Sequence, residues 1–273
     1  MSVTASEIAF LEAKAKTIRR HIVTTIARAR VGHPGGSLSA VDILTALYFH
    51  ILRVDPTRPS WPDRDRFVLS KGHAAVALYS TLAERGFFPV EWLETFGQIN
   101  SPLQVHPDMH KVPGVEISTG ALGMGLSVGL GMALAAQADQ LPIHIYVLLG
   151  DGESQEGQVW EAAMAGGHYR PPNLTAIVDY NGMQLLGPLS KVMEIAPLAE
   201  KWRAFGWQVL EINGHDMYAI VSALENARDD REPTVVIAHT VKGKGISFME
   251  GNASWHGRAL NAEELARALE ELA

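Results

Sequence analysis

The sequence contains no cysteine among its 273 residues. A disulfide framework, a thiolate nucleophile and a cysteine-ligated metal are therefore excluded. A basic surplus is lacking as well, because 23 Lys and Arg residues stand against 30 Asp and Glu residues and the formal net charge is -7. Without a basic block to neutralise a phosphate backbone, nucleic acid is not an expected partner.

The sequence also lacks an apolar run long enough to cross a membrane. Its longest stretch of small apolar residues, from Leu126 to Ala138, is interrupted by glycines and is shorter than the about 20 residues that a spanning helix needs. The N-terminal segment carries Glu7, Glu12 and Lys14, where a signal peptide would have a continuous apolar core. We therefore expect no membrane contact and a place in the cytoplasm.

What the chain does contain is an ordinary globular composition. Of its residues, 47% are hydrophobic and 19% are charged, which suffices to build one large core. No low-complexity linker, charge run or internal repeat divides the sequence. We expect residues 1–273 to form a single domain.

The hydrophobic pattern of the N-terminal part predicts helices. Apolar residues recur at helical spacing from Ile8 to Ile26, and a second helical pattern covers residues 38–52. A connector rich in Pro and Asp follows, and "RFVLSKGHAA" then has the pattern of a short buried strand that leads into a helix.

From Pro142 onward, strands and helices alternate regularly. The pattern predicts strands at 143–149, 174–179, 208–212 and 234–239, and helices at 158–166, 196–205 and 217–227. Near-continuous apolar strands that alternate with helices are typical of a parallel sheet covered on both faces. We predict an α/β fold, a three-layer α/β/α arrangement with a mainly parallel sheet, closed by a helix with Asn261 as its cap.

Polar residues follow two of the predicted strands. Asp151 lies between Gly150 and Gly152 at the end of one strand, and Asn181 follows the next strand. Ligands of open parallel sheets bind beyond the carboxyl ends of the strands, and carboxylate and amide oxygens suit Mg²⁺ with its phosphate and water ligands. Gly-Asp-Gly and Asn-Gly are also common turns, but their pairing at two strand ends predicts a metal and diphosphate site. A dinucleotide fingerprint would need a third glycine.

These segments resemble thiamine-diphosphate enzymes of the transketolase family. The resemblance is carried by "GDGESQEGQVWEAA" and "NLTAIVDYNGMQ", and it extends through "VGHPGGSLSAVDIL", "FVLSKGHAAVALYSTLAERG", "PGVEISTGALGMGLSVGLGMAL" and "VKGKGISFMEGNASWHG". It implies a thiamine-diphosphate-binding domain with thiamine diphosphate and Mg²⁺ or Ca²⁺ as cofactors. The implied reaction moves a two-carbon ketol unit from a ketose, by default a sugar phosphate of the pentose phosphate pathway, to an aldose.

The resemblance also implies roles for individual residues. The metal would be bound by the side chains of Asp151 and Asn181 and by the carbonyl of Met183. Glu156, with Glu161, would belong to a carboxylate cluster where subunits meet. The full set implied to bind the cofactor is His73, Gly120, Leu122, Gly152, Glu153, Glu156, Asn181 and His256.

Histidines supply a further set of candidates. The sequence has 11 histidines, and four of them lie in or beside loops: His33, His73, His106 and His256. Imidazole titrates near neutrality, so it can donate or accept protons near sugar hydroxyls, and the resemblance implies that these four are catalytic. His110 is either an insertion or a substrate contact, and His215 is expected to be part of a structural turn.

Two other features leave alternatives open. The segment Lys242–Gly245, "KGKG", is either a phosphate-binding loop or a solvated turn. Met124 stands where the family usually has glutamine, and a thioether is a poor replacement for an amide in hydrogen bonding.

The resemblance finally implies a partner chain. In the family, a second α/β domain supplies the glutamate that activates the cofactor and the pocket for its pyrimidine ring, and this sequence ends before such a domain. We expect the N-terminal subunit of a split transketolase, which pairs with a C-terminal subunit that carries the pyrimidine-binding domain. The expected assembly is α₂β₂, with copies of this chain meeting near Glu156 and Glu161.

Two other interpretations stay open at this point. The first is the α subunit of a 2-oxo acid dehydrogenase, which usually has paired asparagines where this chain has Tyr180-Asn181. The second is a non-catalytic subunit with a binding or regulatory role. The identity of the donor and acceptor sugars is left open too.

Overall fold

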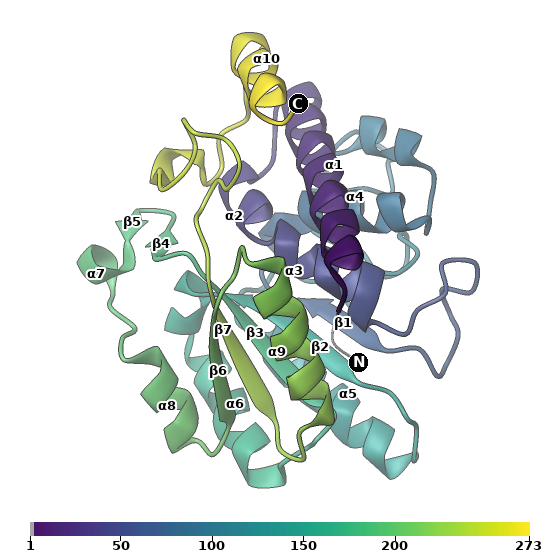
Figure 1. Ribbon diagram of the computed structural model, residues 1–273, viewed down its shortest axis with the longest axis vertical. Coiled ribbons are helices and arrows are strands. Elements are labelled where there is room, and N and C mark those ends of the chain that lie inside the picture. Colours follow the sequence, from purple (N-terminus) through teal and green to yellow (C-terminus); the bar gives the residue numbers. More distant parts are fainter. Residues whose placement is uncertain (1–2) are drawn as a thin grey trace.

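A central sheet of five parallel strands organises the computed structural model, which describes residues 3–273 (Figure 1). The strands are β1 (Arg66–Leu69), β2 (Ile145–Gly150), β3 (Leu174–Tyr180), β6 (Gln208–Asn213) and β7 (Thr234–His239). They are arranged in the order β1-β2-β3-β7-β6, and every neighbouring pair is parallel. The predicted α/β fold with a mainly parallel sheet is confirmed.

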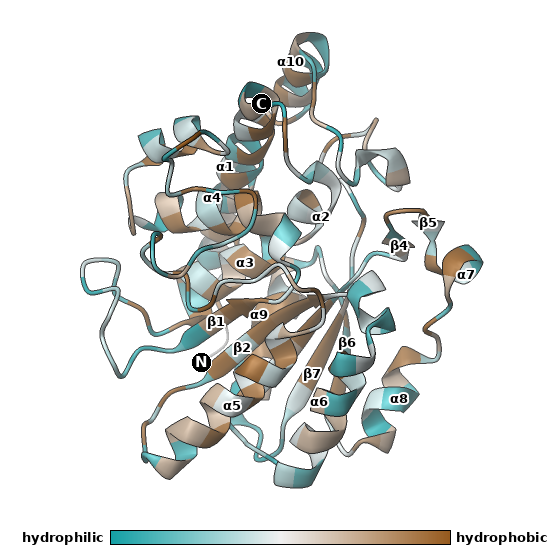
Figure 2. Ribbon diagram, turned by 180° about the vertical axis from the view of Figure 1, so that it is seen from behind, coloured by the Kyte–Doolittle hydropathy of each residue, from teal (hydrophilic) through white to brown (hydrophobic). Residues whose placement is uncertain are grey.

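Alternate residues of each strand face two separate hydrophobic cores. On β2, Tyr146 and Leu148 pack into one core, whereas Val147 and Leu149 pack into the other. The first core lies under α1 (Ala5–Ala29), α3 (Val41–Ala46), α4 (Ala75–Arg85) and α9 (Met217–Asp229). The second lies under α5 (Gly125–Ala138), α6 (Gly157–Tyr169) and α8 (Leu198–Ala204). The sheet is therefore the middle of three layers, and strands β1 and β2 are mostly coloured hydrophobic in Figure 2.

The helix ends follow local chemistry. Thr4 and Glu7 form a capping box at the start of α1, and Asn261 and Glu264 form one at the start of α10 (Ala262–Glu271), as predicted for Asn261. The helical pattern predicted at 38–52 begins earlier, because Pro34 starts α2 (Pro34–Ser39), and it continues through α3 into a π-helical turn at Leu47–Ile51. No helix within residues 3–273 has both the length and the apolar character needed to cross a membrane.

Short elements connect the main ones. A hairpin of β4 (Met183–Gln184) and β5 (Gly187–Pro188) and the helix α7 (Leu189–Val192) follow β3 and were not predicted. Short 3₁₀ turns lie at Gly72–Ala74, Gly152–Gln155 and Ala253–Trp255, and a longer 3₁₀ helix covers Val90–Thr95. Two of these turns come directly after β1 and β2, so they place polar residues at the carboxyl ends of both strands.

Helix α5 divides its small residues between two faces. A Cβ on Gly129 would lie 2.3 Å from Val147 Cγ2, so the absence of a side chain lets the helix pack closely on β2. On the outer side, a Cβ on Gly131 would meet no atom within 4 Å, and Ala135 is exposed. The inner row of small residues therefore serves this chain's own core.

His144, at the opposite end of the sheet from these turns, should make stability depend on pH. It is 5% exposed, its Nε2 lies 2.8 Å from Thr175 Oγ1, and burial followed by the charge of Arg228 lowers its pKa to about 4. Below the unfolded-state pKa near 6.5, the unfolded chain binds a proton that the folded chain does not. The free energy of unfolding therefore decreases as the pH is lowered.

Between pH 7 and pH 5 this one group should lower the unfolding free energy by about 2 kcal/mol. Urea unfolding of the wild type and of His144→Phe over this range measures its share. The pH slope of the variant should be shallower than that of the wild type. Parallel slopes would contradict the role of His144.

Candidate active site

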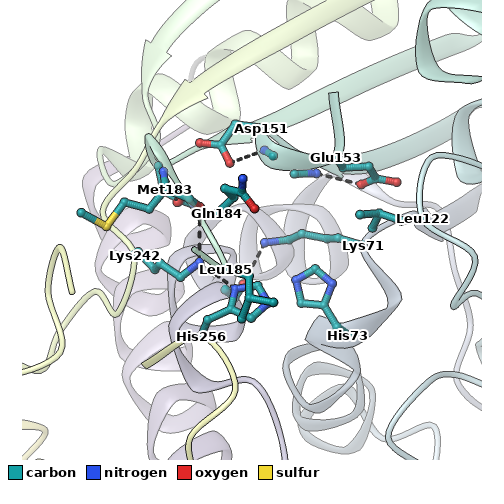
Figure 3. A pocket seen from close by; sticks show the side chains of 14 residues that line it. Lys71, His73, Leu122, Asp151, Glu153, Met183, Gln184, Leu185, Lys242 and His256 are labelled. Carbon is teal, nitrogen blue, oxygen red and sulfur yellow. Dashed lines mark hydrogen bonds between the residues drawn. The ribbon is translucent and has the colours of Figure 1, made fainter. Parts of the chain in front are cut away.

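A cavity of about 260 Å³ opens where the carboxyl ends of β1, β2 and β3 meet the segment after β7. This is the edge at which parallel sheets bind ligands. Figure 3 shows Lys71, His73, Lys242 and His256 approaching the space from the side opposite Asp151. The lining residues are Gly36, Lys71, His73, Leu122, Gly150, Asp151, Gly152, Glu153, Asn181, Met183, Gln184, Leu185, Lys242 and His256.

Asp151 and the turn after β3 form one wall of this cavity. Asp151 is 2% exposed, and its carboxylate accepts hydrogen bonds from the backbone N–H of Gly152 at 2.7 Å and of Gly182 at 2.5 Å. The side chain of Asn181 accepts one from the N–H of Met183 at 3.1 Å. Burial, and then the charge of Asp179, raise the pKa of Asp151 to about 6. A bound cation would offset that burial and keep the carboxylate ionised.

The oxygen atoms on this wall are a carboxylate, an amide and a backbone carbonyl. Such hard donors suit Mg²⁺ or Ca²⁺. Among residues 3–273, no group of three or more His, Asp or Glu side chains is arranged to hold a metal. A metal at Asp151 would therefore need ligands from a bound molecule or from water as well.

Lys242 forms part of the opposite wall. Its ammonium group donates to the carbonyl of Met183 at 3.3 Å and lies 2.9 Å from Nδ1 of His256. Burial, followed by the charge of Lys71, lowers its pKa to about 8. In the described part of the chain, no carboxylate forms an ion pair with Lys242. A buried ammonium group without a counter-charge suits an anionic ligand.

Lys71 is neutralised within the protein. It is 2% exposed, and its ammonium group donates to Asp179 and, at 2.8 Å, to the carbonyl of Gly36. Asp179 also accepts from Ser39 at 2.6 Å and from Thr240. Burial would raise the pKa of Asp179, but the charge of Lys71 and the hydrogen bonds from Lys71, Ser39 and Thr240 together outweigh it and lower that pKa. This buried network joins the ends of β1, β3 and β7 to α2.

Three of the predicted histidines lie together. The ring centroids of His33, His73 and His256 are 5.2 to 5.4 Å apart. Burial is the main cause that lowers the pKa of all three, to about 3 for His256, so the rings are neutral at pH 7. Nδ1 of His33 is buried and has no hydrogen-bond partner among residues 3–273, which leaves it available to a ligand.

The fourth predicted histidine, His106, does not line the cavity. His106 is exposed and packs beside Gly120, where an added Cβ would lie 3.6 Å from its Cδ2. His106 is also close enough to His33 for its charge to lower the pKa of that ring. His110 is exposed and lines a separate hollow with Arg64.

Some of the predicted cofactor residues line the cavity, and others lie outside it. Leu122, Gly152 and Asn181 line the cavity. Glu153 lines it too, but its buried carboxylate accepts from Ser70 and from the N–H groups of Gly123 and Gly150, both at 2.9 Å, so the side chain braces the site. Glu156 is exposed, does not line the cavity, and lies against Gly123.

Sequence reasoning missed several lining residues. The sequence pattern does not mark Lys71, Gln184 and Leu185, and it leaves the role of Lys242 open. Lys71 and Gln184 each lie within three positions of a predicted site residue. Their nearness to the strand ends is the signal that could have found them.

Comparison with known proteins finds one family model and several similar proteins. The model of the family described as "Transketolase, thiamine diphosphate binding domain" matches residues 11–273. The chain is 47% identical to the 6-deoxy-6-sulfo-D-fructose transketolase subunit SqwG of a Clostridium species, over 96% of both chains. It is 46% identical to an apulose-4-phosphate transketolase subunit of Phocaeicola vulgatus, over 97% of this chain and 95% of that one.

Solved structures agree. The crystal structure of transketolase from Campylobacter jejuni superposes on all of this chain with a TM-score of 0.92 at 35% identity, and 43% of that protein is covered. The chain thus spans about two fifths of the length of the transketolase structures that it matches.

The donor set of the cavity fits thiamine diphosphate with a divalent cation, because oxygen ligands lie on one wall and the other wall holds a buried ammonium group that forms no ion pair within the described residues. With the family model matched over residues 11–273 and relatives at 46 and 47% identity covered almost completely, this chain belongs to the transketolase family and contains its thiamine-diphosphate-binding domain.

Proposed function

We propose that this chain is the cofactor-binding subunit of a two-chain transketolase, which moves a two-carbon ketol unit from a ketose to an aldose. Support comes from coverage: relatives named as transketolase subunits are covered over 95 to 96% of their length, whereas 42% of the transketolase of Rattus norvegicus is covered. The proposed partner is a C-terminal subunit with the pyrimidine-binding domain, and the proposed place is the cytoplasm.

The observation that carries this proposal is the division of charge across one cavity. Asp151, Asn181 and the carbonyl of Met183 would hold Mg²⁺ or Ca²⁺ on one wall. Lys242 and His256 on the other wall would bind the diphosphate, to which His73 would also donate. Gly152 would offer backbone N–H near the start of a 3₁₀ turn.

Metal binding would rearrange one contact. Lys242 donates to the same Met183 carbonyl that the cation would use. With the cation in place, the ammonium group would turn to the diphosphate oxygens, where its hydrogen bonds are charge-assisted.

The chain's own side chains would handle protons. When bound, thiamine diphosphate supplies the carbon nucleophile that cleaves and forms the carbon–carbon bond. His33, His73 and His256, kept neutral by burial, each carry one N–H donor and one acceptor nitrogen, and those not engaged by Lys242 or by the diphosphate would serve sugar hydroxyls. His106 would do so from outside the cavity, while Gly120 and Leu122 would pack against the rings of the cofactor.

The identity of the sugar substrate differs between relatives of this chain. Two relatives with nearly equal identity to this chain are named for different substrates, a sulfonated fructose and apulose 4-phosphate. This similarity therefore favours neither substrate, and we propose that the partner subunit recognises the anionic end of the sugar. The family match favours a transketolase over a 2-oxo acid dehydrogenase subunit, and the intact set of cofactor residues favours catalysis over a purely regulatory role.

Titration of the reconstituted complex with thiamine diphosphate in Mg²⁺ tests the cofactor assignment. Lys242→Met should weaken binding about 10- to 100-fold, because a buried charge-assisted hydrogen bond is lost. Calorimetry measures the dissociation constants. Lys244→Met is the matched control, because Lys244 lies in the same loop but pairs with Glu250 at 3.2 Å at the surface. Equal affinity of Lys242→Met and wild type would remove Lys242 from the site.

A further inference from the structure

A buried hydrogen-bond network lies behind the loop that carries Lys242. Asp42 on α3 is 7% exposed and accepts two hydrogen bonds from Arg19 on α1, at 3.0 and 2.7 Å. Its Oδ2 also lies 2.7 Å from Nδ1 of His215. Burial alone would raise the pKa of Asp42, but the hydrogen bonds and charges of His215 and Arg19 together outweigh it and lower that pKa. The carboxylate therefore stays ionised.

The second nitrogen of His215 meets the backbone of the loop. The N–H of Val241 points to Nε2 of His215 at 2.8 Å. Because a backbone N–H can only donate, Nε2 is the acceptor, and the ring proton lies on Nδ1, where it is donated to Asp42. Asp42 thus selects the tautomer that Val241 requires.

The same network fixes the loop on both sides of Lys242. Val241 precedes Lys242 and is held by His215, and the carbonyl of Lys244 accepts from Nε of Arg19 at 3.2 Å. Between them, the N–H of Gly243 donates to the carbonyl of Gly35 at 3.0 Å. The backbone around Lys242 is therefore tied to α1 and, through His215, to α3, while its side chain is directed into the cavity.

We propose that His215 and Asp42 are positioning residues for the diphosphate site, which hold Lys242 in reach of the cofactor without touching it. This inference rests on the proposed function, and it replaces the expectation that His215 only shapes a turn. A backbone shift of the Val241–Lys244 segment would move the ammonium group away from the carbonyl of Met183 and from His256, its two contacts in the cavity.

Three variants of the complex with the pyrimidine-domain subunit test this role. His215→Phe keeps a planar ring but leaves the Val241 N–H without an acceptor. His215→Gln keeps one donor and one acceptor on a planar group, so it can replace both hydrogen bonds. His144→Phe is the matched control, since His144 is another histidine with a hydrogen-bonded ring but lies, buried, at the opposite end of the sheet.

In His215→Phe, the dissociation constant for thiamine diphosphate in Mg²⁺, measured by calorimetry, should rise about tenfold. The concentration of cofactor that gives half-maximal activity should rise by the same factor, while kcat at saturating cofactor stays within about twofold. His215→Gln and His144→Phe should bind the cofactor as the wild type does. If His215→Phe fails to fold, His215→Asn replaces it, because its shorter side chain cannot span Asp42 and Val241, and the same loss is expected.

Two results would overturn the inference while the proposed function stands. One is wild-type affinity for thiamine diphosphate in His215→Phe, which lacks the acceptor for the Val241 N–H. The other is an equal loss in His144→Phe or in His215→Gln, which would indicate a general effect on stability. If the wild-type complex itself does not bind thiamine diphosphate, the proposed function fails instead.

Discussion

Ketol transfer should be absent when the 273-residue chain is assayed alone, and it should appear when the pyrimidine-domain subunit is added. In the proposed function, the partner supplies the glutamate that activates the cofactor, and loss of a positioned general acid or base costs about 10²- to 10⁴-fold in rate. The pyrimidine end of the cofactor would also remain in water. The assay is a coupled measurement of aldose consumption at saturating thiamine diphosphate and Mg²⁺.

Activity should rise in proportion to the complex formed as the partner is titrated. Light scattering on the same samples should give the mass of an α₂β₂ assembly, as expected if copies of this chain meet near the exposed Glu156 and Glu161. Turnover by the lone chain, shown by mass spectrometry to be free of partner, would refute the two-chain proposal. A fully active 1:1 complex would refute only the assembly.

Replacing Asp151 by alanine should reduce the affinity of the complex for thiamine diphosphate by more than about 100-fold. Asp151 is the buried carboxylate on the metal side of the cavity, and without it the cation has no charged protein ligand. Excess Mg²⁺ should recover binding only in part. Asn181→Ala should act in the same direction, with a smaller loss because a neutral ligand is removed. Calorimetry with the partner present measures both.

The control for this series is Asp139→Ala. Asp139 is exposed at the far end of α5 and outside the cavity, so the net charge changes equally without touching the site. Melting curves should show that Asp151→Ala remains folded, because burial raises the pKa of this carboxyl group and its removal relieves that cost. Wild-type affinity in Asp151→Ala would show that the metal assignment is wrong.

Much of the fold was predictable because apolar periodicity is a local property. The strands at 174–179 and 234–239 were placed within one residue of β3 and β7, since near-continuous β-branched and apolar runs suit a sheet buried on both faces. The β4–β5 hairpin was missed, because two-residue strands carry no period to detect. Its exposed tip, Leu185 and Leu186, reads as an ordinary loop.

The candidate site was predictable where its residues come directly after the end of a strand. Asp151 and Asn181 come directly after β2 and β3, which are neighbours in the sheet, so their meeting required no knowledge of loops. Glu153 shows the limit of this argument. The resemblance implied that Glu153 binds the cofactor, which stays a prediction, but two of the donors that hold its carboxylate, Ser70 and Gly123, come from segments 83 and 30 positions away.

By itself, the sequence determined the alternation of strands and helices and the polar residues at the strand ends, because these depend on neighbours along the chain. Only the tertiary structure decided the charge of the cavity. Lys71 and Asp179 are 108 positions apart and neutralise each other because β1 and β3 flank β2. Among residues 3–273 Lys242 has no such partner, because the network of Arg19, Asp42 and His215 holds its loop over the sheet edge. Whether two charges pair depends on their distance in space. Strand order and loop packing determine that distance, and the local sequence does not.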